Sequence, residues 1–293
     1  MLKLKNIGQY KHIILLGALI AISVVFIPME YFSLFFIVLV GLFLGIFFII
    51  SGYKERKECM FLLDIFIVAF LARIIAALFI QSFAISVNNL RLLGDAELYS
   101  ENGYRILQMW LGGMKDLERI YYYVRSTSRG GTLGEYDFYN ALIYFFTGRS
   151  PLAPVFINCF AGAITILFVY DITKKLSNTR AAMFSGILAA FWPSTFMWSA
   201  QNLKEPILVT MICMLMWSLL EIRKRFRFYL VALAFICIAW IKIFRPFLLL
   251  IFFIFVLPLA FVATSRFKRI MALFIFLIAC VTIFVFIDKI KYR

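Results

Sequence analysis

The stretch that decides the fold is residues 61–83, FLLDIFIVAFLARIIAALFIQSF, an apolar run whose charged side chains are Asp64 and Arg73. About 20 consecutive apolar residues span the hydrocarbon core of a bilayer as one helix, so the run predicts a transmembrane helix. A charge at that depth costs about 2.5–3.5 kcal/mol, so Arg73 should face a polar partner or a wet cavity. Asp64 lies more than two helical turns away and is a poor partner. Snorkelling of Arg73 to the outer end of the helix is the alternative.

The rest of the chain has the same apolar character. Of its 293 residues, 64% are hydrophobic and 15% are charged, and the mean hydropathy is +0.96. A soluble domain is nearer half apolar and a quarter charged. We therefore predict an all-α, polytopic membrane protein with about nine transmembrane helices. The nine apolar runs cover residues 13–28, 31–51, 61–83, 150–170, 181–200, 206–222, 228–241, 246–264 and 270–287.

The connections between these runs alternate in charge. One set holds sixteen of the 30 basic residues, whereas the opposite short connections hold Lys204, Lys242 and Arg245. Lys and Arg concentrate in cytoplasmic loops, so the alternation predicts a cytoplasmic N-terminus, and the basic C-terminal tail fits it least well. Topology and contact with membrane lipids thus account for the net charge of +15, and no nucleic-acid partner is expected. The sixteen are Lys3, Lys5, Lys11, Lys54, Arg56, Lys57, Lys174, Lys175, Arg180, Arg223, Lys224, Arg225, Arg227, Arg266, Lys268 and Arg269.

The residue inventory argues against several kinds of site. The five cysteines are scattered without a CxxC pair, so neither a zinc site nor a disulfide framework is indicated. His12 is the single histidine and lies at the start of the first apolar run, which argues against a histidine triad, metal site or general base. Acid–base chemistry must therefore fall to carboxylates, lysines or tyrosines.

One long connection, residues 84–149, holds seven of the fifteen acidic residues. The predicted topology places it on the outer face, and its aromatic content argues against disorder. The pattern from Asp95 to Leu111 predicts an amphipathic helix at the membrane surface, and a second short helix is predicted over residues 138–146.

Asp95 and Glu97 are the first candidates for chemistry in this connection. An acid at the start of a helix is ordinarily a cap. Here the acids lie beside spans whose outer ends carry Arg73, Lys204 and Arg245. A carboxylate can deprotonate a sugar hydroxyl, and cations can stabilise a leaving phosphate. We therefore predict Asp95 and Glu97 as catalytic residues, with helix capping as the alternative.

Residues 191–206, FWPSTFMWSAQNLKEP, join two spans with almost no linker. Pro193 should kink the first helix, and Pro206 suits the first turn of the next. The Lys204-Glu205 pair between the spans is either a polar hairpin tip or part of a site at the level of Asp95.

We predict Arg245, Lys204 and Arg73 as contacts to a donor phosphate, and Tyr99 and Glu205 as contacts to the substrate. Arg245 is the strongest of the three cations because a guanidinium offers a planar fork that binds phosphate through two hydrogen bonds.

Four motifs, taken in order, resemble the GT-C superfamily of polytopic glycosyltransferases. The nearest likeness is to the family 39-like group of protein O-mannosyltransferases and lipid A aminoarabinose transferases. The resemblance covers about residues 61–265 and suggests a GT-C-like module over 60–265, preceded by two helices in 1–59 and followed by a last helix and tail in 266–293. The motifs are Leu71-Ala72-Arg73, Gly94-Asp95-Ala96-Glu97-Leu98-Tyr99, the segment from Tyr139 to Gly148-Arg149-Ser150-Pro151-Leu152, and the segment from Pro193-Ser194 to Asn202-Leu203-Lys204-Glu205.

The resemblance implies transfer of a sugar from a polyprenyl-phosphate donor to a hydroxyl of a glycan, lipid or protein, by direct displacement with inversion. The site would lie on the outer face of the plasma (inner) membrane, with Asp95 as base and Arg245 and Lys204 on the phosphate. The resemblance allows a divalent cation, Mg²⁺ or Mn²⁺, which the residues themselves do not require.

Two departures from the family keep alternatives open. The motif reads Asp-Ala-Glu where many relatives have adjacent Asp-Glu, which leaves the role of Glu97 open. Many relatives also continue beyond nine spans, so acceptor recognition is expected to be missing or to come from a partner subunit. The alternatives are a non-catalytic subunit of a glycan-assembly complex and a polymerase or ligase that uses a lipid-linked oligosaccharide. A transporter is disfavoured because polar groups at mid-membrane are few.

Overall fold

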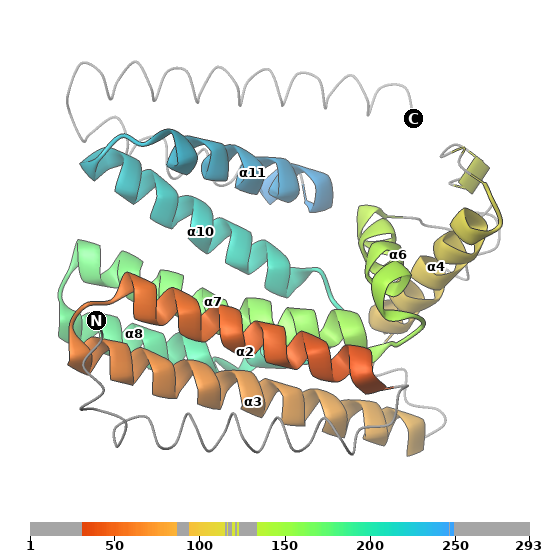
Figure 1. Cartoon of the computed structure of the whole chain (residues 1–293), viewed down its shortest axis with the longest axis horizontal. Helices are drawn as coiled ribbons and strands as arrows, with labels where there is room; N and C mark the ends of the chain where they lie inside the picture. Colours follow the sequence, from red (N-terminus) through yellow and green to blue (C-terminus); the bar gives the residue numbers. More distant parts are fainter. Residues whose placement is uncertain are drawn as a thin grey trace, which may run out of the picture.

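The computed structural model describes residues 31–86, 94–114, 116, 119–120, 122, 134–245 and 247–248. The fold is all-helical over these residues (Figure 1). The predicted runs 13–28 and 270–287 lie outside them, and run 246–264 is described at residues 247–248 alone. The helices are α2 (Phe32–Gly52), α3 (Arg56–Ser86), α4 (Gly94–Leu111), α6 (Glu135–Thr147), α7 (Leu152–Leu176), α8 (Thr179–Phe191), α9 (Pro193–Ser199), α10 (Glu205–Lys224) and α11 (Phe228–Phe244).

Four of these helices, α2, α3, α7 and α10, are long and apolar enough to cross a membrane. α8 and α9 make a fifth candidate span, bent by 50° at the break before Pro193, as the sequence predicted. α11 is apolar but has 17 residues. Large apolar side chains such as Phe43 and Phe79 are 64% and 70% exposed, as contact with lipid requires. The described chain is thus a multi-pass helical membrane protein, whereas the count of nine spans stays a prediction.

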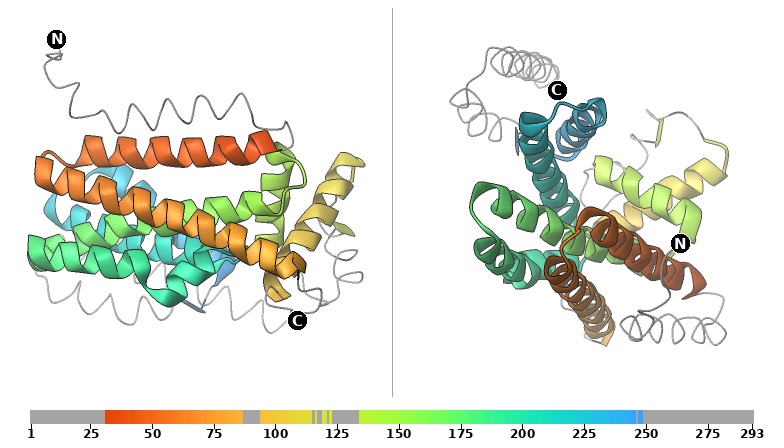
Figure 2. Two further views of the ribbon diagram at one scale, coloured as in Figure 1. Left: turned by 90° about the horizontal axis from the view of Figure 1, so that it is seen from below. Right: turned by 60° about the vertical axis from the view of Figure 1, so that its left-hand side comes forward.

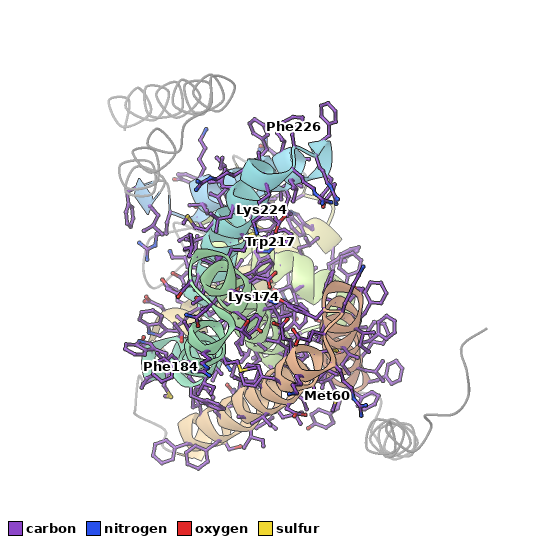
Figure 3. The ribbon with its side chains drawn as sticks, turned by 90° about the vertical axis from the view of Figure 1, so that its left-hand side faces the viewer. Met60, Lys174, Phe184, Trp217, Lys224 and Phe226 are labelled. Carbon is purple, nitrogen blue, oxygen red and sulfur yellow. The ribbon has the colours of Figure 1, made fainter. Side chains whose placement is uncertain are left out.

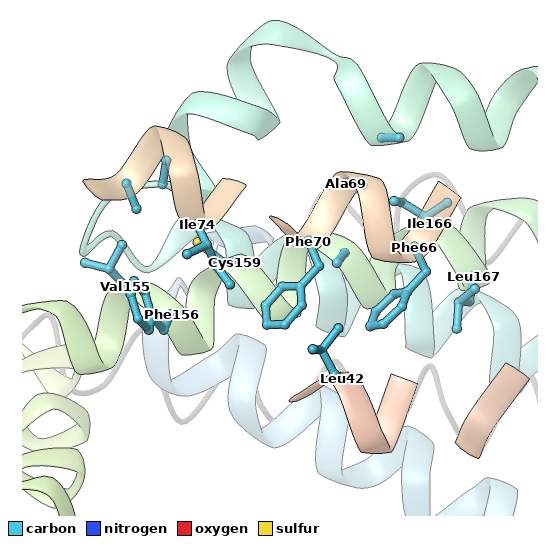
Figure 4. Close-up of a cluster of buried hydrophobic side chains, with 14 of the residues drawn as sticks. Leu42, Phe66, Ala69, Phe70, Ile74, Val155, Phe156, Cys159, Ile166 and Leu167 are labelled. Atoms are coloured by element: carbon cyan, nitrogen blue, oxygen red, sulfur yellow. The ribbon is translucent and has the colours of Figure 1, made fainter. Parts of the chain in front are cut away.

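The core lies where α3 crosses α7 and α2 (Figure 4). The rings of Phe66 and Phe70 on α3 stack with centroids 5.9 Å apart, and Phe160 of α7 meets both edge-on. A Cβ atom at Gly45 of α2 would lie 2.0 Å from the Phe66 ring. Glycine at this position therefore allows α2 to pack against the aromatic pair.

The connections α2–α3, α7–α8 and α10–α11 lie together at one end of the bundle, called the basic end here (Figures 1 and 3). They carry the predicted basic clusters of the described spans. Lys174 donates to Glu58 at 2.6 Å, and Lys175 approaches Glu221 at 2.5 Å. These ion pairs join α3 and α10 to the end of α7. The alternation of charge read from the sequence is thus real for the described spans, while the side of the membrane stays a prediction.

Candidate functional site

α4 and α6 lie across the end of the bundle opposite to the basic end (Figures 1 and 2). The helix predicted from Asp95 to Leu111 is present as α4, and α6 begins three residues before the predicted 138–146 helix. A Cβ atom at Gly103 would lie 2.6 Å from the Cβ of Asn140. This glycine, in the middle of α4, lets α4 and α6 approach to backbone contact.

A buried hydrogen-bond network holds the loop between α9 and α10 against α4, α6 and α7. The Tyr136 hydroxyl lies 2.9 Å from Oδ1 of Asn202 and 3.0 Å from the carbonyl oxygen of Leu203. Asn158 of α7 donates to the same Leu203 carbonyl at 2.7 Å and to the Tyr136 hydroxyl at 3.2 Å. The Asn202 amide reaches the carbonyl of Ala96 in the first turn of α4 at 3.5 Å. The network therefore fixes the segment that precedes Lys204.

Tyr99, Lys204, Glu205 and Arg245 come together at this end, as predicted, with Asp95 beside them. The ammonium of Lys204 lies 5.5 Å from the centroid of the Tyr99 ring. A guanidinium nitrogen of Arg245 lies 3.4 Å from Oε1 of Glu205. Burial, followed by the negative charges of Asp95 and Glu205, raises the pKa of Tyr99 to about 12. The tyrosine therefore stays protonated and can donate a hydrogen bond.

Lys204 and Arg245 are two cations that act on one another. Burial and then the positive charge of Arg245 lower the pKa of Lys204, against the charges of Glu205, Glu135 and Asp95. Lys204 also directly precedes α10, and the first turn of a helix attracts negative charge. An anion bound between the two cations would relieve their repulsion.

Asp95 and Glu97 are both exposed in the first turn of α4. Within the described part of the chain neither makes a hydrogen bond or an ion pair, so both carboxylates are open to a ligand. They lie two residues apart, so they leave the helix about 200° apart and face different directions. Asp95 lies one helical turn before Tyr99 on the same face of α4, which places this carboxylate at the cluster. Glu97 has no comparable link.

Asp137 on α6 is a residue of this site that the sequence did not single out. Its side chain is 1% exposed, and the backbone N–H of Gly134 donates to its Oδ2 at 2.7 Å. Its other oxygen has no hydrogen-bond partner among the described residues. Burial raises the pKa of Asp137 to about 7, although the Gly134 N–H, the nearby amide of Asn102 and the charge of Lys204 all oppose the shift. The signal in the sequence that could have pointed to Asp137 is its position three residues after Gly134, where a helix begins.

Arg73 lies inside the helical bundle, against α8 and α9. Its guanidinium is fully buried between α3, α8 and α9, and its donors face Ser199, Ala69 and Ala189. Within the described chain it makes no ion pair. Because protein atoms on α3, α8 and α9 accept from its buried donors, Arg73 does not offer these donors to a phosphate at Lys204 and Arg245.

An apolar cavity of about 320 Å³ opens at the break between α8 and α9. It runs between α7 and α10, and its lining reaches Pro206, two residues after Lys204. Its walls are formed by Gly162, Thr165, Val169, Ser185, Leu188, Ala189, Trp192, Thr195, Trp198, Pro206, Val209 and Cys213.

The described residues do not supply an evident metal site. Among them, no three His, Cys, Asp or Glu side chains gather closely enough to hold a metal ion. Asp95 and Glu97 face different directions, and Asp137 is buried. The described residues therefore do not gather a ligand set for the Mg²⁺ or Mn²⁺ that the resemblance allows.

Comparison with known proteins identifies a family for this chain. The family model of dolichyl-phosphate-mannose-protein mannosyltransferases matches residues 136–287, just over half of the chain. No match is found among curated proteins or among solved structures. The matched region starts at α6 and includes Lys204, Glu205 and Arg245, whereas Asp95 and Tyr99 precede it. The chain belongs to the dolichyl-phosphate-mannose-protein mannosyltransferase family of GT-C membrane glycosyltransferases.

Proposed function

We propose that this protein transfers a sugar from a polyprenyl-phosphate donor to a hydroxyl acceptor at the membrane surface that holds α4 and α6. The observation that carries the proposal is a cluster of groups at one end of the bundle. Lys204 lies 5.5 Å from the centroid of the ring of Tyr99, which follows the exposed carboxylate of Asp95 by one helical turn, and Arg245 contacts the adjacent Glu205. A base beside cations suits transfer from a phosphate-linked sugar, because the acceptor hydroxyl loses a proton while the leaving phosphate oxygen gains negative charge.

The donor phosphate lies between Lys204 and Arg245 in this proposal. The Arg245 guanidinium makes a long contact to Glu205, lies 5.7 Å from the centroid of the Phe247 ring and is partly exposed, so it can turn its fork toward a phosphate. Lys204 adds a point charge at the start of α10. The apolar chain of the lipid follows the cavity at the α8–α9 break, whose lining begins next to Glu205 at Pro206.

Asp95 is the general base. The acceptor hydroxyl attacks the anomeric carbon, its proton passes to Asp95, and the bond from that carbon to the phosphate oxygen breaks. The electron pair stays on the polyprenyl phosphate, where the two cations stabilise it, and the configuration at the anomeric carbon inverts. Tyr99, which is protonated and lies against Lys204, donates a hydrogen bond to the sugar.

The family description names mannose on a dolichyl phosphate and a protein acceptor. The same chemistry is proposed for this chain, with the sugar and the acceptor left to experiment. A divalent cation has no step here, since the described residues do not gather ligands for one.

The experiment is to purify the protein gently and to identify co-purifying lipids by native mass spectrometry. Wild type is compared with Arg245→Ala and with Arg223→Ala, which removes an exposed arginine at the basic end. We expect a polyprenyl-phosphate sugar bound to wild type and to Arg223→Ala and depleted in Arg245→Ala.

Two results would contradict the proposal. A pyrophosphate-linked oligosaccharide in place of the monophosphate sugar would assign a polymerase or ligase. A donor lipid that is equally abundant in all three proteins would remove Arg245 from the phosphate site.

A further inference from the structure

The bent span α8–α9 leaves backbone carbonyls at the end of α8 without their helical donors, and the carbonyl of Ala189 is one of them. α8 ends at Phe191, and Pro193 begins α9. In an unbroken helix the N–H of residue 193 would donate to the carbonyl of Ala189, but proline has no N–H. At membrane depth an unpaired carbonyl costs several kcal/mol, so another donor must replace the missing one.

Arg73 supplies that donor from α3. Its guanidinium donates to the carbonyl of Ala189 at 3.4 Å and, through Nε, to the hydroxyl of Ser199 at 3.0 Å. The guanidinium also lies over the ring of Phe196, 5.2 Å from its centroid. One side chain thus contacts the last turn of α8 and both turns of α9. A cation at a helix C-terminus is further stabilised by the helix dipole.

α7 provides the room for this arrangement. A Cβ atom at Gly162 would lie 2.9 Å from Nε of Arg73 and 2.9 Å from Cβ of Ser199. The thiol of Cys159, one turn earlier, donates to the carbonyl of Ser199 at 3.3 Å. α7 therefore packs closely around the contact between Arg73 and Ser199, and a side chain at position 162 would displace one of the two residues.

α9 leads directly into the segment that carries Lys204. Ser199 is the last residue of α9, and the loop that follows is held by Asn158 and Tyr136. We propose that Arg73 is a positioning residue: its guanidinium replaces the hydrogen bond that Pro193 removes, fixes α9 against α3, and so sets Lys204 at the donor-phosphate site. The last step of this inference rests on the proposed function.

Direct phosphate binding by Arg73 does not fit the same observations. The side chain is 0% exposed, and its donors face protein atoms on three helices. A guanidinium in this place can affect binding of the donor lipid by positioning α9, but it does not contact the lipid.

The first test reads the position of α9 without any activity. The protein is labelled with 5-fluorotryptophan, and ¹⁹F resonances are assigned by Trp→Phe substitution. Trp192 directly precedes α9 and Trp198 lies in its last turn, while Trp217 lies at the basic end against Asp171. We expect Arg73→Met and Arg73→Lys to shift or broaden the Trp192 and Trp198 resonances and to leave Trp217 unchanged.

The lysine variant keeps the charge but cannot donate from three nitrogens at once, and it guards against a methionine variant that fails to fold. Asp64→Asn, which neutralises an exposed charge on the same helix, is the control and should change none of these resonances. Unchanged Trp192 and Trp198 resonances in both folded Arg73 variants would overturn the proposal.

The second test measures binding of the polyprenyl-phosphate sugar that co-purifies with wild type. We expect the Arg73 variants to bind it about 10- to 100-fold more weakly, the effect of a displaced contact on a rigid site. In a Pro193→Ala background, where residue 193 regains its N–H, the loss caused by Arg73→Met should be smaller. Shifted resonances with unchanged binding would refute the link from α9 to Lys204. Absence of any bound donor in wild type would instead refute the proposed function, while the resonances still decide the role of Arg73.

Discussion

Replacing the buried carboxyl of Asp137 by the neutral amide of Asn should make the protein more stable at high pH. Asp137 is 1% exposed, and burial raises its pKa to about 7 from an ordinary value of 3.8. The folded protein therefore binds a proton that the unfolded chain has already lost over this range. Stability consequently falls as the pH rises from about 4 to about 7, and above that the full cost of the buried charge is present.

The size of the effect follows from the shift. A difference of about three pKa units corresponds to about 4 kcal/mol, because each unit is worth about 1.4 kcal/mol. The Asn side chain keeps an oxygen that can accept from the N–H of Gly134, a contact of 2.7 Å in wild type. Asp137→Asn should therefore match wild type near pH 4 and exceed its stability by up to about 4 kcal/mol at pH 8.

Thermal unfolding in detergent from pH 5 to pH 8 measures this difference. Asp64→Asn removes an exposed carboxylate on α3, away from Asp137, and should leave the pH dependence unchanged. A gap between Asp137→Asn and wild type that widens with pH is the expected result. If Asp137→Asn is instead less stable than wild type at pH 8, the carboxylate acts as a charged partner of Lys204 and the reasoning fails.

Two further substitutions test how the site is held. Tyr136→Phe removes the hydroxyl that meets Asn202 and Leu203, and thermal or denaturant unfolding should show a loss of about 1–3 kcal/mol. Tyr139→Phe is its control, because that hydroxyl makes no hydrogen bond with the described residues, and equal losses in the two variants would contradict the network. Gly103→Ala places a methyl group 2.6 Å from Asn140 and should lower the free energy of unfolding by about 1–3 kcal/mol. Gly94→Ala is its control, because a Cβ atom there meets no atom within 4 Å, and it should lower the stability less. A Gly103→Ala variant as stable as wild type would show that α4 can move away from α6.

The sequence predicted much of the described fold because single-helix signals are local. The run 61–83 appears as α3, and the proline at position 193 breaks its span by 50° as predicted. The alternation of basic residues placed Lys204 and Arg245 at the end that holds Asp95. Each of these inferences needed hydropathy, charge or proline chemistry within one segment.

The sequence could not identify the partners of Arg73 and Asp137, because these come from segments far apart in the chain. The carbonyl that meets Arg73 belongs to Ala189, 116 residues later, and Pro193 lacks the N–H that would pair with this carbonyl in an unbroken helix. Asp137 looked like one of several loop acids until α4 packed over it through Gly103. A residue pattern shows that a buried charge needs a partner, but the fold decides which one it meets.

The most direct measurement of the central claim is sugar transfer by Asp95→Asn, with the lipid donor that co-purifies with wild type. The account predicts that this variant still binds the donor, since Lys204 and Arg245 remain, and that transfer falls by about 100-fold or more because the base is lost. Asp95→Glu should recover part of the activity, and Asp64→Asn should retain all of it. Transfer by a correctly inserted Asp95→Asn at the rate of wild type would contradict the account.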